Sequence, residues 1–273
     1  MARRSGEFWT QRKVAWYRRA LGRSDFAPKV LGAIAPLLEE CETALDVGAG
    51  CGALAIPLAQ RLRRVTAVEP AAAMAKALAE EVRERGLTNV SVVEAAWGDV
   101  PVPPHDLVLC AHVANLLERD SPFLREAPAC ALKGVAFVRD ATGSGDKFFF
   151  KELYPALLGR SYGGPCEQEE TVEALARLGV APTVTLIDYR SDQPFTDLEE
   201  ACDFWMEYMG LQGEQPRAFL RTFLAERLVR DGDEWIAPYP KRAAVIWWRV
   251  GASFSSSPLP PHPASPLRGE EKR

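Results

Sequence analysis

Three alternate glycines after a short apolar run are the feature that most constrains this chain. Residues 45–52 read Leu-Asp-Val-Gly-Ala-Gly-Cys-Gly, and the pattern that follows predicts a helix over 53–62. Glycine accepts tight turns and has no Cβ to hold a ligand at a distance. A helix start behind such a loop offers backbone N–H groups to a negative group. The loop therefore predicts a ligand pocket at the end of a buried strand over 43–47.

A carboxylate ends the next strand-like run. The run 65–69 stops at Glu69, seventeen residues beyond Gly52. A carboxylate on the strand next to a glycine loop is placed to accept both hydroxyls of a ribose. The loop and Glu69 together predict a pocket for a small molecule that contains a nucleoside.

Two classes of cofactor use such a pocket. The spacing Gly48-x-Gly50-x-x-Ala53 also satisfies the dinucleotide fingerprint, which is weak evidence by itself. Asp46, inside the predicted strand end, would repel a diphosphate but can serve an ammonium group. Gly52 follows at alternate spacing, whereas a dinucleotide site has its third glycine three residues on. These details favour a ligand with an ammonium group and leave a nicotinamide cofactor as the alternative.

The combination of these segments resembles the class I S-adenosylmethionine (SAM) dependent methyltransferases. Residues 45–52 resemble their first motif, 65–70 the second, 92–99 the adenine-binding turn and 106–113 the fourth motif. The resemblance covers residues 43–138. It implies SAM as cofactor and an α/β fold, a doubly wound, mostly parallel seven-stranded sheet with helices on both faces.

The same resemblance implies individual contacts with SAM. Asp46 would orient the amino group, and Pro70 and Met74 would cover one adenine face while Trp97 covers the other. Many relatives carry an acid at the adenine turn, but alanines stand at 95–96, so we expect backbone contacts there. The residues implied for the cofactor are Asp46, Gly48, Ala49, Gly50, Cys51, Gly52, Glu69, Pro70, Met74, Ala96, Trp97, Ala111, His112 and, from the N-terminal helix, Tyr17.

Methyl transfer from a sulfonium requires no particular catalytic residue type. The protein must align the acceptor with the methyl carbon, exclude water and in some cases remove a proton. His112 directly follows a predicted strand over 106–111, at the sheet edge where ligands bind, and is the candidate base. Lining the pocket beside the methionine portion of the cofactor and a purely structural role are the alternatives for this residue. His105, at the opposite end of the strand, is expected on the surface.

Strand and helix patterns alternate along the chain, as in a parallel sheet. We expect an N-terminal helical cap over 1–40, a SAM-binding domain over 41–252 and a disordered Pro/Ser-rich tail over 253–273. The expected strands are 43–47, 65–69, 90–94, 106–111, 134–140, 182–189 and 243–250. The expected helices are 7–21, 28–39, 53–62, 71–85, 121–130 and 168–178.

Two long segments depart from a minimal domain of this kind. The connection 141–166 is rich in aromatic residues, and an insertion over about 191–242 contains predicted helices at 197–209 and 215–228. We expect the insertion and the N-terminal helices to form a lid over the acceptor. An extra helical layer is the alternative. The basic, aromatic stretch 2–23 is typical of an amphipathic helix lying on the domain, with a transit peptide as the alternative.

Composition narrows the class of partner. The net charge is −4, so no overall basic field attracts nucleic acid. No apolar stretch approaches the roughly 20 residues of a membrane span, and the six cysteines are scattered, which predicts free thiols and no metal site. We therefore expect a cytoplasmic methyltransferase acting on a small molecule. A NAD(P)-dependent oxidoreductase and a non-catalytic SAM-binding protein are the alternatives.

Overall fold

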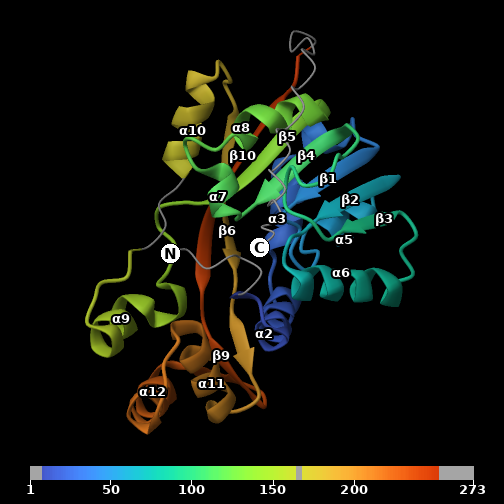
Figure 1. The fold of residues 1–273 in the computed structure, drawn as a ribbon. Coiled ribbons are helices and arrows are strands. Elements are labelled where there is room, and N and C mark those ends of the chain that lie inside the picture. Colours follow the sequence, from blue (N-terminus) through green and yellow to red (C-terminus); the bar gives the residue numbers. More distant parts are fainter. Residues whose placement is uncertain (1–7, 164–167, 252–273) are drawn as a thin grey trace, which may run out of the picture.

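A seven-stranded sheet forms the centre of the molecule (Figure 1). The computed structural model describes residues 8–163 and 168–251. The strands of this sheet are β1 (Thr43–Val47), β2 (Arg64–Val68), β3 (Val90–Val93), β4 (His105–Ala111), β5 (Ala131–Asp140), β6 (Thr183–Arg190) and β10 (Pro240–Arg249). Their order is β3-β2-β1-β4-β5-β10-β6, and β10 runs antiparallel to both of its neighbours. The predicted doubly wound, mostly parallel sheet is confirmed.

Helices cover both faces of the sheet because alternate strand residues are apolar on each side. One face packs against α3 (Phe26–Ala33), α4 (Ala35–Leu38), α5 (Ala55–Ala59) and α6 (Ala72–Glu84). The other packs against α7 (Ala114–Leu117), α8 (Phe123–Glu126) and α10 (Gln168–Arg177). None of the helices in the described part of the chain is both long and apolar enough to cross a membrane.

The expected strands and crossover helices form at the predicted places, with two local differences. The helix expected over 53–62 is shortened to α5, because the turn that begins at the glycines continues to Leu54. The helix expected over 121–130 divides into α8 and the 3-10 helix η1 (Ala127–Cys130). Pro128 has no backbone N–H to continue the α-helical hydrogen bonds at that point. The expected tail over 253–273 lies outside the described residues.

The insertion carries its own small sheet. The expected helices are present as α11 (Leu198–Met209) and α12 (Glu214–Arg227), and the strands β7 (Gln193–Phe195), β8 (Val229–Asp231) and β9 (Glu234–Ala237) pair in the order β7-β9-β8. We call these five elements the insertion subdomain. The strands were not predicted, since three or four residues are too few for a recognisable period. Figure 1 shows β6 and β10 running from the main sheet down to this subdomain.

The aromatic connection after β5 joins the same subdomain. It contains the short helix η2 (Lys147–Phe149) and α9 (Phe150–Leu158). Phe148 lies 4.9 Å from Phe204 between ring centroids, and the indole N–H of Trp205 donates to the carbonyl of Phe148 at 2.7 Å. Much of the aromatic content of the connection thus packs as a core.

Helix α2 (Gln11–Gly22) lies between the main sheet and the insertion subdomain (Figure 1). Its Trp16 is 1% exposed, and the ring centroid lies 5.2 Å from that of Phe204 in α11. The Trp16 indole donates to Glu200 at 3.0 Å, and the amide of Gln193 donates to the Trp16 carbonyl at 3.1 Å. The helix is therefore part of the packed structure.

The arginines of α2 and its C-cap are paired with acids from other elements. Glu200 accepts from Arg19 as well as from Trp16. The remaining pairs are Arg12 with Asp203, Arg18 with Glu81, and Arg23 with Asp231 and Glu234. The expected helix lying on the domain is confirmed, and its positive charge serves to hold it there.

Replacing Glu200 by glutamine should loosen this attachment. Burial opposes ionisation, but hydrogen bonds from Arg19, Thr196 and Trp16 lower the pKa of Glu200 to about 2. We expect Glu200→Gln to reduce the free energy of unfolding at pH 7 by about 2 kcal/mol, the scale of charged hydrogen bonds. A carboxyl group whose pKa is lower in the folded protein stabilises the fold at pH values above its unfolded pKa. The difference in unfolding free energy between the wild type and Glu200→Gln should therefore shrink as the pH falls from 4.5 towards 2.

Urea unfolding at pH 7 and pH 3 measures both effects. The control is Glu199→Gln, the neighbouring acid, whose ion pairs with Arg217 and Arg221 are on the surface and are therefore expected to contribute little. Equal losses in the two variants would contradict the attachment.

Candidate functional site

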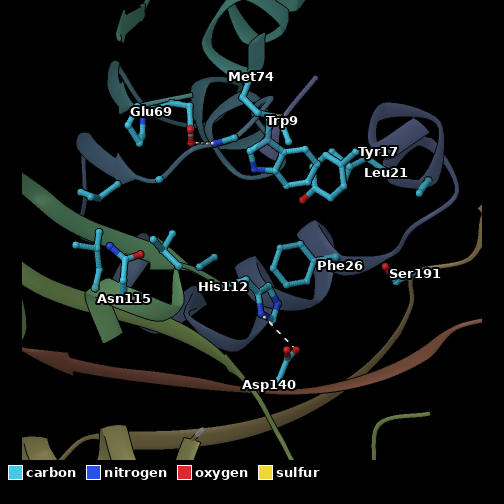
Figure 2. A pocket seen from close by; sticks show the side chains of 18 of the residues that line it. Trp9, Tyr17, Leu21, Phe26, Glu69, Met74, His112, Asn115, Asp140 and Ser191 are labelled. Atoms are coloured by element: carbon cyan, nitrogen blue, oxygen red, sulfur yellow. Dashed lines mark hydrogen bonds and ion pairs between the residues drawn. The ribbon is translucent and has the colours of Figure 1, made fainter. Parts of the chain in front are cut away.

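A cavity of about 560 Å³ opens where β1, β2, β4 and β5 end. This size is typical of sites for small molecules. The loop after β1, helices α2 and α3, and the facing ends of β6 and β10 complete its wall. Figure 2 shows Glu69 and Met74 at one end, with His112, Phe26 and Asp140 at the other. We call these the Glu69 end and the His112 end.

The glycine loop serves the cavity and the core at different positions. Gly50 lines the cavity with a φ of +57°, and no atom of the described residues beyond its two chain neighbours lies within 4 Å of where a Cβ would stand. At Gly52, by contrast, a Cβ would lie 2.5 Å from Leu78 Cδ1. Gly50 leaves an open approach for a ligand, whereas Gly52 lets the loop pack on α6.

Glu69 is held by two backbone amides. Its Oε2 accepts from the N–H of Gly50 and its Oε1 from the N–H of Ala71, both at 2.8 Å. The residue is 7% exposed and lines the cavity. Burial raises the pKa of Glu69, and the two amides act in the opposite direction. Each oxygen keeps a lone pair, so the carboxylate can accept two hydroxyl donors.

Asp46 lies just behind the wall. It is 2% exposed and accepts from the backbone N–H of Ala55, while its Oδ2 has no hydrogen-bond partner among the described residues. Burial raises the pKa of Asp46 to about 7. A buried carboxylate oxygen without a partner is costly, and an ammonium group reaching it from the cavity would supply one.

Several other expected contacts line the Glu69 end. They are Gly48, Pro70, Met74, Ala96, Trp97 and Tyr17. The Trp97 indole donates to Glu126 at 2.6 Å, which fixes the ring at the cavity edge. The Tyr17 hydroxyl points towards the middle of the cavity in Figure 2.

Besides Asp46, three expected contacts are not among the residues that form the wall: Ala49, Cys51 and Gly52. The backbone N–H of Ala49 donates to the carbonyl of Val68 at 3.1 Å. Cys51 packs in a small buried cluster with Val14 and Met74. Gly48 and Gly50 line the cavity, whereas Ala49, Cys51 and Gly52 bond or pack within the protein and so shape the loop.

His112 occupies the His112 end with a φ of +56°, an uncommon conformation for a residue with a side chain. Its backbone N–H donates to the carbonyl of Val138 at 2.9 Å. Its Nδ1 lies 3.4 Å from Asp140 Oδ1, and its Nε2 lies 3.1 Å from the Tyr189 hydroxyl. Both ring nitrogens therefore already have polar neighbours. Ala111, also expected, lines the wall beside it.

The imidazole is neutral near pH 7. Burial, and next the positive charge of Lys241, lower the pKa of His112 to about 3. A neutral ring with Nδ1–H directed to Asp140 and Nε2 accepting from Tyr189 satisfies both contacts. This arrangement favours a hydrogen-bonding wall residue over a base that holds a proton.

Sequence reasoning missed the polar neighbours of His112. Asp140 pairs with the ammonium of Lys241 at 2.8 Å, and Lys241 faces Tyr189 across the β10–β6 register. Asp140 ends a predicted strand, so the rule that selected His112 could have found it. Lys241 lies on the antiparallel strand, and its position follows only from the pairing. Lys147 also lines the cavity.

Of the two segments expected to form a lid, the N-terminal helices cover the cavity and the helices of the insertion do not. Tyr17 and Leu21 of α2, Phe26 of α3, and Trp9 line the cavity. For α11 and α12 the expectation is wrong, because none of their described residues lines the cavity and α2 lies between. The insertion reaches the wall only through its ends, at Ser191 and Lys241.

The expected surface position of His105 is also wrong. It is the first residue of β4 and is fully buried. Its Nε2 lies 2.9 Å from the Thr66 hydroxyl and its Nδ1 lies 2.7 Å from the carbonyl of Pro103. These contacts give both ring nitrogens of His105 a hydrogen-bonding partner at the buried start of β4.

Comparison with known proteins gives a match for the part of the chain that carries the glycine loop. Residues 44–133 match the protein family described as "Methyltransferase domain". An uncharacterized protein of Haemophilus influenzae is 25% identical over 249 residues, which cover 89% of this chain and 88% of that protein.

Solved structures are similar at lower identity. A SAM-dependent methyltransferase from Aquifex aeolicus is 20% identical, with 85% of this chain and 98% of that chain covered and a TM-score of 0.46. Magnesium protoporphyrin IX methyltransferase from Synechocystis, with bound SAH, is 13% identical, with 85% of each chain covered and a TM-score of 0.47.

The environment of His112 predicts that its ring does not titrate in the ordinary range. We expect ¹⁵N NMR spectra to show a neutral Nδ1–H imidazole from pH 8 down to pH 5, because burial and Lys241 disfavour the cation. The His112→Asn variant assigns the signal. A titration midpoint near pH 6.5, the value of a solvated histidine, would contradict the lowered pKa.

Proposed function

Since residues 44–133 belong to the methyltransferase-domain family and lie in a class I fold, we propose that this chain transfers a methyl group from SAM to a small-molecule acceptor. The family match supports SAM as the cofactor. SAM supplies an activated methyl group on a sulfonium, so alignment and exclusion of water are the main tasks left to the protein.

The observation that carries this proposal is the pair of carboxylates around the glycine loop. Glu69, fixed by the amides of Gly50 and Ala71, is suited to a ribose diol. The partnerless Oδ2 of buried Asp46 is suited to the amino group of the methionine portion. A dinucleotide would bring a diphosphate close to Asp46 instead, which a carboxylate repels.

The remaining cofactor contacts follow from the wall. Pro70, Met74 and Trp97 offer apolar and aromatic surface for an adenine, and Ala96 offers backbone at the same turn. Tyr17 covers the middle of the cavity from α2. Together these residues would hold the methyl group near the His112 end and keep water from it.

The acceptor then occupies the His112 end. Phe26 and Tyr189 provide aromatic surface there, with ring centroids 4.9 Å apart, and the Tyr189 hydroxyl, which meets His112 Nε2, can still accept a hydrogen bond. Helices α2 and α3 form part of this wall, which leaves room for a small molecule and suits a polymer poorly. The net charge of −4 agrees with an acceptor other than nucleic acid.

Binding measurements test the cofactor assignment. By isothermal titration calorimetry we expect SAM and S-adenosylhomocysteine to bind in the micromolar range and NADH not to bind. Glu69→Ala should weaken SAM binding about tenfold or more, since hydrogen bonds to a charged acceptor contribute roughly 1.5–3 kcal/mol each. Glu84→Ala, an exposed acid on α6, is the control. Binding of NADH in place of SAM would overturn the assignment.

The raised pKa of Asp46 predicts a pH dependence. Below about pH 7 the free protein carries a protonated Asp46, whereas an ammonium partner requires the carboxylate. We expect the affinity for S-adenosylhomocysteine to rise from pH 6 to pH 7.5, and Asp46→Asn to bind more weakly without that rise. Parallel pH profiles for the two proteins would show that Asp46 does not meet the amino group.

A further inference from the structure

The two ends of the cavity differ in charge. Among the described residues that line it, the charged ones are Glu69 at one end and Asp140, Lys147 and Lys241 at the other. Two lysines, Lys147 and Lys241, thus face the cavity at the His112 end. His112 adds no positive charge, because its ring is neutral near pH 7.

Lys241 is fixed in place. Its side chain is 12% exposed, and its ammonium lies 2.8 Å from Asp140 Oδ1. The same ammonium lies 5.6 Å from the ring centroids of Tyr189 and Tyr239. In such an enclosed site a charge acts more strongly than it does in water, so Lys241 bears on any ligand bound beside it.

Lys147 comes from a turn that is held under strain. The next two residues, Phe148 and Phe149, have φ values of +52° and +57°, which bulky side chains rarely adopt. The strain is offset by packing: Phe149 stacks on Trp205 at 6.0 Å, and the Trp205 indole donates to the Phe148 carbonyl. Observed backbone strain at a cavity is a reason to look for function, and here it presents an ammonium to the cavity wall.

Lys147 and Lys241 interact electrostatically with the same two side chains, His112 and Asp140. Both ammonium groups lower the pKa of His112 and of Asp140. Ser191 lines the cavity as well, and its hydroxyl can donate a hydrogen bond. Two ammonium groups and a hydroxyl donor on one wall can bind an anion.

We propose that the acceptor is a carboxylic acid, bound as its carboxylate at the His112 end by Lys147 and Lys241. This inference rests on the proposed function, since it takes the Glu69 end for the cofactor. Phe26 and Tyr189 suit a planar or aromatic body attached to the carboxylate. The two lysines are specificity-determining residues in this account.

The test uses the full chain saturated with S-adenosylhomocysteine and probes that differ in charge alone. The pairs are benzoate with benzamide and phenylacetate with phenylacetamide, measured by isothermal titration calorimetry. We expect each carboxylate to bind at least about tenfold more tightly than its amide, because charge-assisted hydrogen bonds are the stronger ones.

Substitutions of Lys147 and Lys241 test whether these lysines cause the preference for a carboxylate over its amide. Lys147→Gln and Lys241→Gln should each largely remove it, while Lys151→Gln, an exposed lysine on α9, should leave it intact. Lys241→Gln leaves Asp140 without its ammonium, so thermal unfolding checks its fold. Lys241→Arg keeps the charge and should keep the preference.

The outcomes separate the two proposals. Failure of S-adenosylhomocysteine to bind would overturn the proposed function. If it binds and the amides bind as well as the carboxylates, or neither probe of a pair binds, the carboxylate acceptor is wrong and the proposed function stands. Loss of the preference in Lys151→Gln to the same extent would also refute the role of Lys147 and Lys241.

Discussion

The carboxylate of Glu69 links the three pieces of backbone on which the cavity depends. It accepts from Gly50 in the loop after β1 and from Ala71 at the start of α6, while its own residue follows β2. Separate strands are thereby held in one geometry at the sheet edge. Burial would disfavour the charge, but two amide donors compensate for part of that cost. The open side of Gly50 and the free lone pairs of Glu69 are consequences of the same contact.

Short sequence patterns are sufficient to predict the main sheet and the Glu69 end of the cavity. Apolar runs gave the strands of the main sheet, and the spacing of glycines and acids placed Gly50 and Glu69 at neighbouring strand ends. These features depend on residues close in sequence, so a period or a motif reveals them. His105 shows the limit of such reasoning, because its burial depends on Thr66 and Pro103 from neighbouring segments.

The other half of the cavity depends on contacts between distant residues. Helix α2 lines the wall because its Trp16 and Arg19 are bound by residues about 180 positions later, Glu200 and, for Trp16, also Phe204. Tyr189 meets Lys241 through strand register. No local pattern encodes either contact. The insertion subdomain was expected to cover the cavity itself, yet it acts through α2, which it positions.

The insertion subdomain leaves and re-enters the main sheet at one point. Ser191 donates its N–H to the carbonyl of Tyr239 at 2.9 Å, and the N–H of Tyr239 donates to Asp192 at 2.8 Å. These bonds close the loop at its base, immediately beside the Lys241–Tyr189 pair. The insertion subdomain therefore joins the main sheet through a closed base, and the start of β10 that carries Lys241 is held beside the end of β6 where the chain leaves the sheet and returns to it.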